Sequence, residues 1–417
     1  MATIDLKYGR SVIEFEYDDA AVSVLGSAAE GAPLTDAGLG EKLDRPIDSP
    51  SLEEIVSANE SVLITVPDAT RRTACGQVVN LVVRRLIASG IAAHDIRIIF
   101  ASGIHRKVTE EEKAAILTPF IAQRIKTLDH DPRDLMQIIR LGETEDGIPI
   151  ELNRALVEHD HVIIVGGASF HYFAGFTGGR KLICPGLAST RTISETHKRA
   201  FDCETQSRRT GVDTGKLDGN AVHEAFVQVV EKIEPAFAIS TIVNDAGEAV
   251  DLFCGDWQTS HRAACDSFAA THTIQIQEKR DLVVVSGGGY PHDINMIQAH
   301  KALDAAARAC SDGGTIVMLA ECIDGTGRDD FLRWFEAENS DMLAERLCEK
   351  YQVNGQTAWS LLKKAERFDV RIVTGMAPET AGRMRLNKIS AAAAAELVRN
   401  NSAPAYIVPA GAKINIC

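Results

Sequence analysis

Residues 171–197 bring together several side chains that can do chemistry. His171 can transfer a proton, Lys181 can form a covalent bond through its amine, and His197 can bind a metal ion. A pair of adjacent glycines between them lets the backbone approach a ligand closely. A purely structural segment seldom needs all of these features, so this stretch is the first candidate for a functional site.

The glycine-rich turn at residues 175–181 has two explanations. Exposed N–H groups beside a cation suit a bound phosphate, although the spacing is not that of a Walker loop because no Ser or Thr follows Lys181. A tight turn needed only for folding explains Gly178 and Gly179 equally well. A single histidine binds metal weakly, so a metal ion at His197 would need further ligands from elsewhere.

Other polar residues follow apolar runs that are typical of strands. Asp68 and Arg71 follow one such run, and His105 follows the next. The arginine could bind a carboxylate or a phosphate with both of its terminal nitrogens, or the segment could simply cap a helix and leave the arginine in solvent. Gln298 and Lys301 are three residues apart in a helical pattern, a spacing that fits a surface pair and a pair in a site equally well.

Apolar runs that end in polar or glycine-rich turns alternate with helical patterns along most of the chain. The predicted strands are 62–68, 96–103, 161–167, 281–289, 315–320, 370–375 and 405–409. Residues 241–253 are typical of a hairpin that turns at 244–247. We therefore predict an α/β protein of two domains, each with a mostly parallel sheet flanked by helices.

The predicted domains are residues 1–272, which carry the candidate histidines and Lys181, and residues 273–417, which carry Gln298 and Lys301. The strand at 405–409 could belong to either domain. Because ligands of open α/β sheets bind beyond the carboxyl ends of the strands, we expect the active site in a cleft between the domains.

Composition narrows the class of protein. The chain has 417 residues and a net charge of -14, which disfavours a nucleic-acid-binding surface and favours small-molecule chemistry. The nine cysteines are scattered without a CxxC pair, so we expect neither a disulfide framework nor a zinc ribbon. The N-terminus lacks a signal-peptide core, and no run approaches the roughly 20 apolar residues of a membrane span. We expect a cytoplasmic protein.

Taken together, the motifs resemble those of the nickel-dependent lactate racemase family, in the same order and over most of the chain. They are PDATR at 67–71, SGIH at 102–105, HYFAGFTGGRK at 171–181, PG at 185–186, TI at 192–193, His197, and YPHDINMIQAHK at 290–301.

The resemblance implies a cofactor. In that family, nickel is held by a pyridinium mononucleotide with two sulfur-bearing substituents, the nickel-pincer nucleotide. Carried over to this sequence, Lys181 is the residue to which the nucleotide is attached, and His197 is the protein ligand of nickel. From anion-binding chemistry, we further expect the turn formed by Thr177, Gly178, Gly179 and Arg180 to contact the nucleotide phosphate.

The resemblance also implies a reaction. The family is thought to racemise 2-hydroxy acids by removing a hydride and returning it to the other face of a transient 2-keto acid. His105 and His171 would be the general acid/base pair. The set implied to hold the substrate is Asp68, Arg71, Gln298 and Lys301. Proteins that synthesise and load the cofactor are the expected partners, and neither nucleic acid nor membrane is expected.

Two positions depart from the family pattern. Ile297 stands where lactate racemases carry tyrosine, and Thr196 stands where asparagine is usual. The first change predicts a different or broader 2-hydroxy acid substrate. The extra cations Arg72 and Arg180 make malate the first dicarboxylate to test. The alternatives are a hydride-transfer dehydrogenase and a non-catalytic protein that binds a nucleotide or a nickel cofactor.

Overall fold

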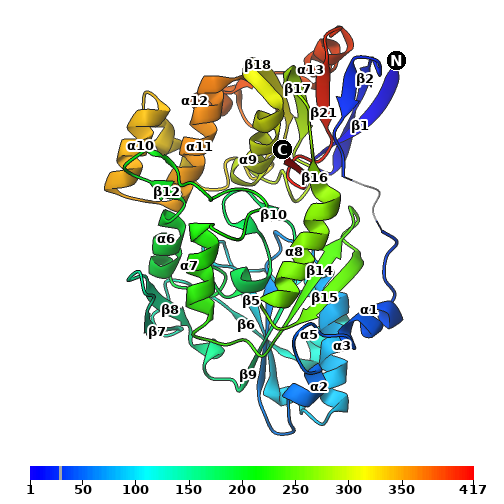
Figure 1. Cartoon of the computed structure of the whole chain (residues 1–417), viewed down its shortest axis with the longest axis vertical. Coiled ribbons are helices and arrows are strands. Elements are labelled where there is room, and N and C mark those ends of the chain that lie inside the picture. The colour runs from blue at the N-terminus through cyan, green and yellow to red at the C-terminus, as the bar shows by residue number, and fades with distance from the viewer. Residues whose placement is uncertain (28–30) are drawn as a thin grey trace. The chain divides into compact units, whose positions relative to one another are not determined.

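The structure is a computed structural model that describes residues 1–27 and 31–417 (Figure 1). The chain forms two compact units. Unit 1 contains Met1–Ala28, Phe201–Arg209 and Ala269–Cys417, and unit 2 contains Ala29–Ala200 and Thr210–Phe268. The change of unit at 268/269 lies close to the predicted boundary at 272. The N-terminal segment and residues 201–209, however, belong with the C-terminal part of the chain.

Unit 2 is built on a six-stranded sheet in the order β15-β14-β9-β4-β5-β6. Its strands are β4 (Val62–Pro67), β5 (Ile96–Ala101), β6 (Lys126–Asp129), β9 (His161–Gly167), β14 (Phe237–Val243) and β15 (Ala249–Gly255). Neighbouring strands are parallel from β14 to β6, whereas β14 and β15 form the predicted antiparallel hairpin. Every residue of β4 is buried, as expected for a central strand of a parallel sheet.

Helices and short strands complete unit 2. The helices are α1 (Asp36–Leu43), α2 (Leu52–Ile55), α3 (Cys75–Ala88), α4 (Glu110–Ile116), α5 (Pro119–Arg124), α6 (Thr190–Lys198), α7 (Ala221–Val230) and α8 (Thr259–His272), the last of which runs on into unit 1. The short strands are β7 (Ile138–Glu143), β8 (Pro149–Asn153), β10 (Phe170–His171) and β11 (Gly175–Phe176). The apolar side of α3, which includes Val78 and Val82, packs into the same core as Ile64 of β4.

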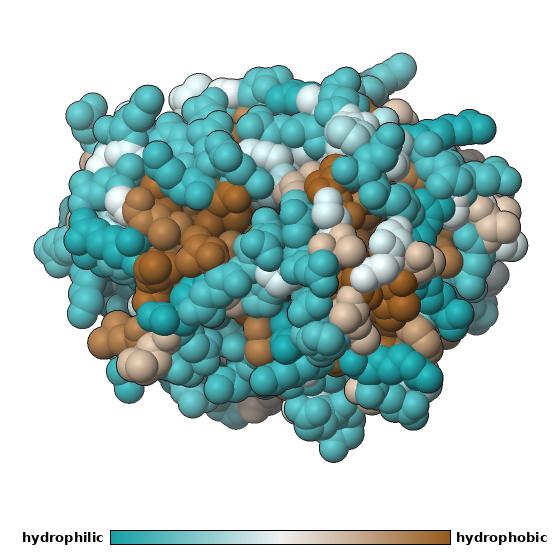
Figure 2. All heavy atoms as spheres, turned by 90° about the horizontal axis from the view of Figure 1, so that it is seen from below, coloured by the Kyte–Doolittle hydropathy of each residue, from teal (hydrophilic) through white to brown (hydrophobic). Residues whose placement is uncertain are grey.

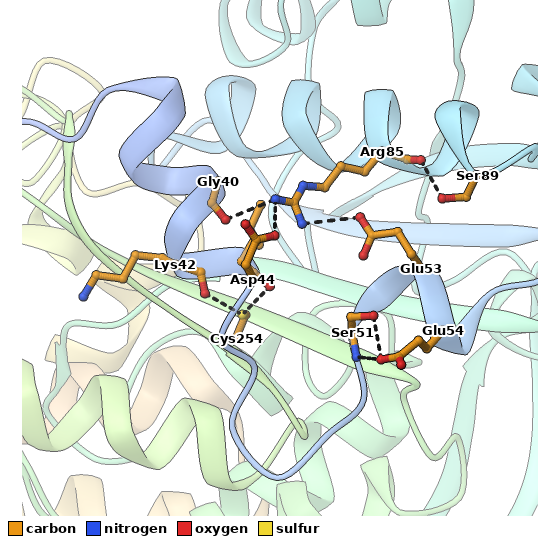
Figure 3. Close-up of polar contacts among 10 residues, drawn as sticks. Gly40, Lys42, Asp44, Ser51, Glu53, Glu54, Arg85, Ser89 and Cys254 are labelled. Carbon is orange, nitrogen blue, oxygen red and sulfur yellow. Dashed lines mark hydrogen bonds and ion pairs between the residues drawn. The ribbon is translucent and has the colours of Figure 1, made fainter.

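Arg85 of α3 connects three helices on the outside of this core (Figure 3). Its guanidinium donates to the Gly40 carbonyl and the Asp44 carboxylate at the end of α1, and to Glu53 of α2. These bonds fix the two short helices, which could not be stable by themselves.

Unit 1 contains a second six-stranded sheet, in the order β20-β19-β18-β17-β21-β3, whose strands pair in parallel. These strands are β3 (Val22–Val24), β17 (Arg280–Ser286), β18 (Cys310–Leu319), β19 (Asp369–Val373), β20 (Asn387–Lys388) and β21 (Ala405–Val408). The strand predicted at 405–409 therefore pairs with β17, inside the C-terminal part of the chain.

The two faces of this sheet have separate coverings. Val283 and Val285 of β17 belong to a core that is covered by α9 (Met296–Ala309), α10 (Ser340–Glu349) and α11 (Val353–Arg367). The same core includes residues in and near α12 (Pro378–Arg383). Leu282 and Val284 face the opposite way, toward the hairpin of β1 (Ala2–Tyr8) and β2 (Ser11–Tyr17) and toward α13 (Ala391–Arg399). This alternation follows from the two-residue period of a strand. The predicted α/β class with mostly parallel sheets is confirmed.

Segment 201–209 folds back on itself as β12 (Phe201–Asp202) and β13 (Ser207–Arg208), which pair with each other. Elsewhere in unit 1, β16 (Thr273–Ile274) pairs with β22 (Asn415–Ile416). A ring contact, an ion pair and a disulfide join the segment to the rest of unit 1. Phe201 packs edge-on against Trp359 with ring centroids 5.0 Å apart, and Arg208 pairs with Asp304 at 3.1 Å.

A disulfide joins Cys203 of this segment to Cys348 of α10. The cysteine pattern predicted no disulfide framework, and it gave no signal for this single pair. Cysteine spacing cannot reveal a bond that depends on a segment returning to the other unit.

The surface drawn in Figure 2 is mostly hydrophilic, with apolar residues exposed in separate patches. Within the described residues, no helix combines the length and the hydropathy that a membrane crossing requires.

Candidate active site

An aspartate and a histidine form a close pair at the carboxyl edge of the unit 2 sheet. β4 and β5 are parallel neighbours whose last residues, Pro67 and Ala101, lie opposite each other, so the loops that follow them meet. Nδ1 of His105 lies 2.7 Å from Oδ2 of Asp68. Asp68 is buried, whereas the side chain of His105 is 43% exposed.

The surroundings of Asp68 keep it ionised. Burial alone would raise the pKa of this carboxyl, but the charge and hydrogen bond of His105, a bond from Thr70 and the charge of Arg71 together lower it to about 2. Burial lowers the pKa of Arg71, and Asp68 opposes that shift. Because an ionised carboxylate can only accept, Nδ1 of His105 carries a proton, and Nε2 is the basic atom of the neutral ring.

His171 lies on β10, which follows β9, the other neighbour of β4. The ring is 7% exposed, and its Nδ1 accepts a hydrogen bond from the Ala174 backbone N–H at 3.3 Å. A neutral ring that accepts at Nδ1 carries its proton on Nε2. His105 and His171 therefore have opposite tautomers in their neutral forms, one with a basic Nε2 and the other with an Nε2–H.

Lys181 lies in the 3-10 helix Gly179–Leu182, which contacts β4 and β9. Its ammonium nitrogen is 5.1 Å from the ring centroid of Phe226 and 5.7 Å from that of Phe173. Both rings also flank His197, with centroid distances of 5.4 Å and 5.3 Å. The lysine and the second histidine thus share an aromatic surrounding.

His197 occupies the last turn of α6, which begins after the N-cap Ser189. The ring is 5% exposed, and Nδ1 lies 2.8 Å from the Ile193 carbonyl, to which it donates. Burial, followed by the charge of Lys181, lowers the pKa of His197 to about 3. The imidazole is therefore neutral with Nε2 as its electron-pair donor, which is the form that binds a metal ion.

Backbone bonds tie the loop of His105 to that of Lys181. The Gly103 N–H donates to the Gly186 carbonyl at 2.9 Å, and the Gly186 N–H donates to the Lys181 carbonyl at 3.0 Å. A Cβ on Gly186 would lie 2.6 Å from the Leu182 carbonyl oxygen and 2.8 Å from the Ala101 side chain. Only glycine fits at position 186, where the two loops approach each other, which explains the glycine of the Pro-Gly motif.

Residues 177–180, the turn expected to contact a phosphate, make polar contacts with backbone carbonyls of the protein itself. Thr177 Oγ1 donates to the Gly167 carbonyl at 3.1 Å. A Cβ on Gly178 would lie 2.6 Å from that same carbonyl oxygen, and one on Gly179 would lie 2.5 Å from the His261 ring, with φ positive at both glycines. Arg180 is only 1% exposed. Close packing therefore requires these glycines, and the Arg180 guanidinium does not reach the surface.

Gln298 and Lys301 lie in unit 1, on the first turns of α9, whose N-cap Asn295 accepts from the Gln298 N–H. Nζ of Lys301 donates to Oε1 of Gln298 at 2.7 Å. Ile297 packs half-buried against the apolar core of unit 1. That these residues complete the site of unit 2 stays a prediction, as does the cleft.

Two side chains that hold this site have no signal in the sequence. Asn220 and His261 are both buried and bind carbonyl groups of the 171–181 loop. Neither belongs to a motif, so no signal in the sequence singles them out. No three His, Cys, Asp or Glu side chains in residues 1–27 and 31–417 are grouped as a metal site.

Comparisons with known proteins point to one family. Residues 8–209 match the lactate racemase N-terminal domain, and residues 275–414 match the lactate racemase C-terminal domain. The lactate racemase of Lactiplantibacillus plantarum is 31% identical over 79% of this chain and 77% of its own length, and that of Thermoanaerobacterium thermosaccharolyticum is 29% identical over 81% and 78%.

Solved structures show the same relationship. The lactate racemase apoprotein from Thermoanaerobacterium thermosaccharolyticum superposes with a TM-score of 0.89 at 26% identity over the whole of both chains. A protein from Thermotoga maritima shares the fold, with a TM-score of 0.73 at 20% identity over 94% of this chain and all of the other.

These relatives indicate an isomerase of the racemase class. The chain belongs to the lactate racemase family.

Proposed function

We propose that this protein racemises a short 2-hydroxy acid, lactate or a relative such as malate, with a nickel-pincer nucleotide attached to Lys181. The observation that carries the proposal is the arrangement of unit 2, in which the Asp68–His105 pair is tied through Gly186 to the loop of Lys181. The lactate racemases to which the chain is similar supply the substrate class.

The donors present fit such a cofactor. His197 is buried and neutral, with its proton on Nδ1 and Nε2 as the electron-pair donor. A cofactor that brings sulfur and carbon donors needs only one imidazole from the protein. When bound, this group would accept a hydride from the substrate carbon and return it.

The residues of the chain would handle the proton. Nε2 of His105 takes the hydroxyl proton of one enantiomer, and Asp68 stabilises the imidazolium that results. His171 would act on the opposite face, where inversion places the hydroxyl of the other enantiomer. To take up that proton at Nε2, the ring would have to exchange the tautomer that accepts from the Ala174 N–H for the one with a basic Nε2. We assign the substrate carboxylate to Arg71 and Lys301, with Gln298 orienting Lys301 through their 2.7 Å bond.

The decisive experiment compares protein produced with and without the cofactor-synthesis proteins, which are the proposed partners. Intact mass, nickel content and racemisation of L-lactate and L-malate are measured on each sample. We expect an adduct that maps to Lys181, about one nickel per chain, and racemisation by the loaded sample alone. Unmodified Lys181 together with no activity would refute the proposal.

The His105→Ala variant separates the alternatives. We expect it to keep nickel and adduct but to lose racemisation. Release of one 2-keto acid per substrate consumed would instead indicate a dehydrogenase. Cofactor binding without turnover in both wild type and variant would indicate a carrier. Racemisation of malate as well as lactate is expected if the Ile297 position broadens the specificity, and activity on lactate alone would show that it does not.

A further inference from the structure

Five successive carbonyl groups of the loop between His171 and Lys181 accept hydrogen bonds from donors in unit 2. The pairs are Phe173 with Asn220 at 2.9 Å, Ala174 with Arg180 at 2.7 Å, Gly175 with the Gly215 N–H at 3.0 Å, Phe176 with Arg180 at 3.1 Å, and Thr177 with His261 at 2.8 Å. A loop with every carbonyl bonded over this stretch is held in one conformation.

Arg180 makes two of these bonds with one side chain. Its guanidinium binds the Ala174 and Phe176 carbonyls, and among the described residues no carboxylate pairs with it. A buried charge without a counterion is expensive, and an apolar side chain of similar size would often be more stable. Retaining an arginine here therefore favours a functional reason, because a planar fork can hold two carbonyls at once.

Ala174 links Arg180 to His171, the proposed acid/base. Its carbonyl is held by Arg180, and its N–H donates to Nδ1 of His171. The bond at Nδ1 orients the His171 ring. Arg180 thus acts on His171 through a single backbone residue.

His261 of α8 supports the same loop from a second direction. Nε2 donates to the Thr177 carbonyl, while Nδ1 lies 3.8 Å from the Cys265 thiol. Burial, followed by the charge of Arg180, lowers the pKa of His261 to about 3, so the ring is a neutral donor at Nε2. Arg180 also lies 3.3 Å from that Nε2, but two donors cannot bond to each other.

We propose that Arg180 and His261 are positioning residues that set the orientation of His171 and its placement relative to Lys181. The inference rests on the proposed function and assigns Arg180 a role other than phosphate contact. Neither residue touches a reacting atom. Both hold the backbone of the loop that carries His171 and Lys181.

The test uses full-length, cofactor-loaded protein with the variants Arg180→Lys, His261→Leu and His261→Gln. Lysine keeps the charge but cannot bind two carbonyls in a fork, leucine removes the donor to Thr177, and glutamine restores an N–H donor. Arg262→Lys is the matched control, because Arg262 adjoins His261 on α8 but pairs with Asp218 at the surface.

We expect kcat to fall about 10- to 100-fold in Arg180→Lys and His261→Leu, since a displacement of about 1 Å costs on the order of 100-fold. KM should stay within about twofold, because the carboxylate-binding residues are unchanged. His261→Gln should recover most of the lost kcat, and Arg262→Lys should match wild type. Equal kcat in all variants, or a loss that glutamine does not rescue, would overturn the inference.

Hydrogen exchange of the apoprotein provides a second readout that does not depend on the cofactor. Amides of residues 173–177 should exchange faster in Arg180→Lys and His261→Leu than in wild type or Arg262→Lys. Unchanged exchange would refute the positioning role even if the proposed reaction were correct. If the loaded wild type lacks racemase activity but exchange is faster in these variants, the proposed function is refuted, while the support of the loop by Arg180 and His261 stands. If Arg180→Lys fails to fold, the two His261 variants decide.

Discussion

Replacing Asp68 by Asn tests whether the pair with His105 is the base of the reaction. The substitution keeps the size of the side chain but removes the charge that stabilises a His105 imidazolium. Two unit charges about 4 Å apart interact by about 1 kcal/mol in water and about 4 kcal/mol at an effective dielectric of 20. Because His105 is partly exposed, we expect a value between these limits and a fall in kcat of about 100-fold.

The assay is racemisation of each lactate enantiomer by the loaded enzyme, followed by enantioselective chromatography. The matched control is Glu60→Gln, because Glu60 pairs with His161 at the same 2.7 Å distance but at the start of β9, away from the site. We expect this control to keep wild-type kcat. An Asp68→Asn variant whose kcat stays within about threefold of wild type would refute the assignment of His105 as an Asp68-supported base.

The Asp68→Asn substitution should also change how the free energy of unfolding depends on pH. The pKa of Asp68 is lowered from 3.8 to about 2, so the folded protein favours the carboxylate by about 2 kcal/mol. This contribution is present above pH 3.8 and is lost as the pH falls through about 2. Urea unfolding should therefore show Asp68→Asn less stable than wild type near pH 6, with a difference that shrinks toward pH 2. A difference independent of pH would show that ionisation of Asp68 does not stabilise the fold.

Two further predictions concern the metal ligand and the disulfide. His197→Ala should reduce nickel from about one per chain to less than about a tenth, while intact mass still shows the adduct on Lys181; full nickel retention would exclude His197 as the ligand. Cys203→Ser should lower the free energy of unfolding by about 2–4 kcal/mol, as should dithiothreitol in wild type. Cys417→Ser, at an exposed free thiol, serves as the control, and equal stability of all three proteins would contradict the disulfide.

The strands and part of the site could be predicted because local signals determine them. Apolar runs that stop at Asp68 and near His105 mark strand ends, and parallel strands bring their carboxyl ends to one edge. That rule alone makes contact between the two residues plausible. Which strands are neighbours is not local information, so the position of β4 between β5 and β9 had to come from the structure.

The return of residues 201–209 to unit 1 has no local signal either. The segment is short and polar, and it is held by contacts with Trp359, Cys348 and Asp304, each more than 90 residues away in sequence. The N-terminal hairpin behaves similarly, because its apolar side is explained only by the sheet face that it covers. Predicted boundaries that assume contiguous domains cannot represent either segment.

Arg180 shows why the character of the glycine turn was ambiguous in the sequence. A cation beside glycines suggests anion binding, so Arg180 was expected to contact a phosphate and the adjacent Lys181 to carry the cofactor. In a 3-10 helix, however, there are about three residues per turn, so neighbouring side chains point roughly 120° apart. Lys181 accordingly lies beside Phe173 and Phe226, while Arg180 turns inward to the Ala174 carbonyl. The same local geometry that places Lys181 beside the two aromatic rings therefore directs Arg180 to the Ala174 carbonyl, whose residue also bonds His171.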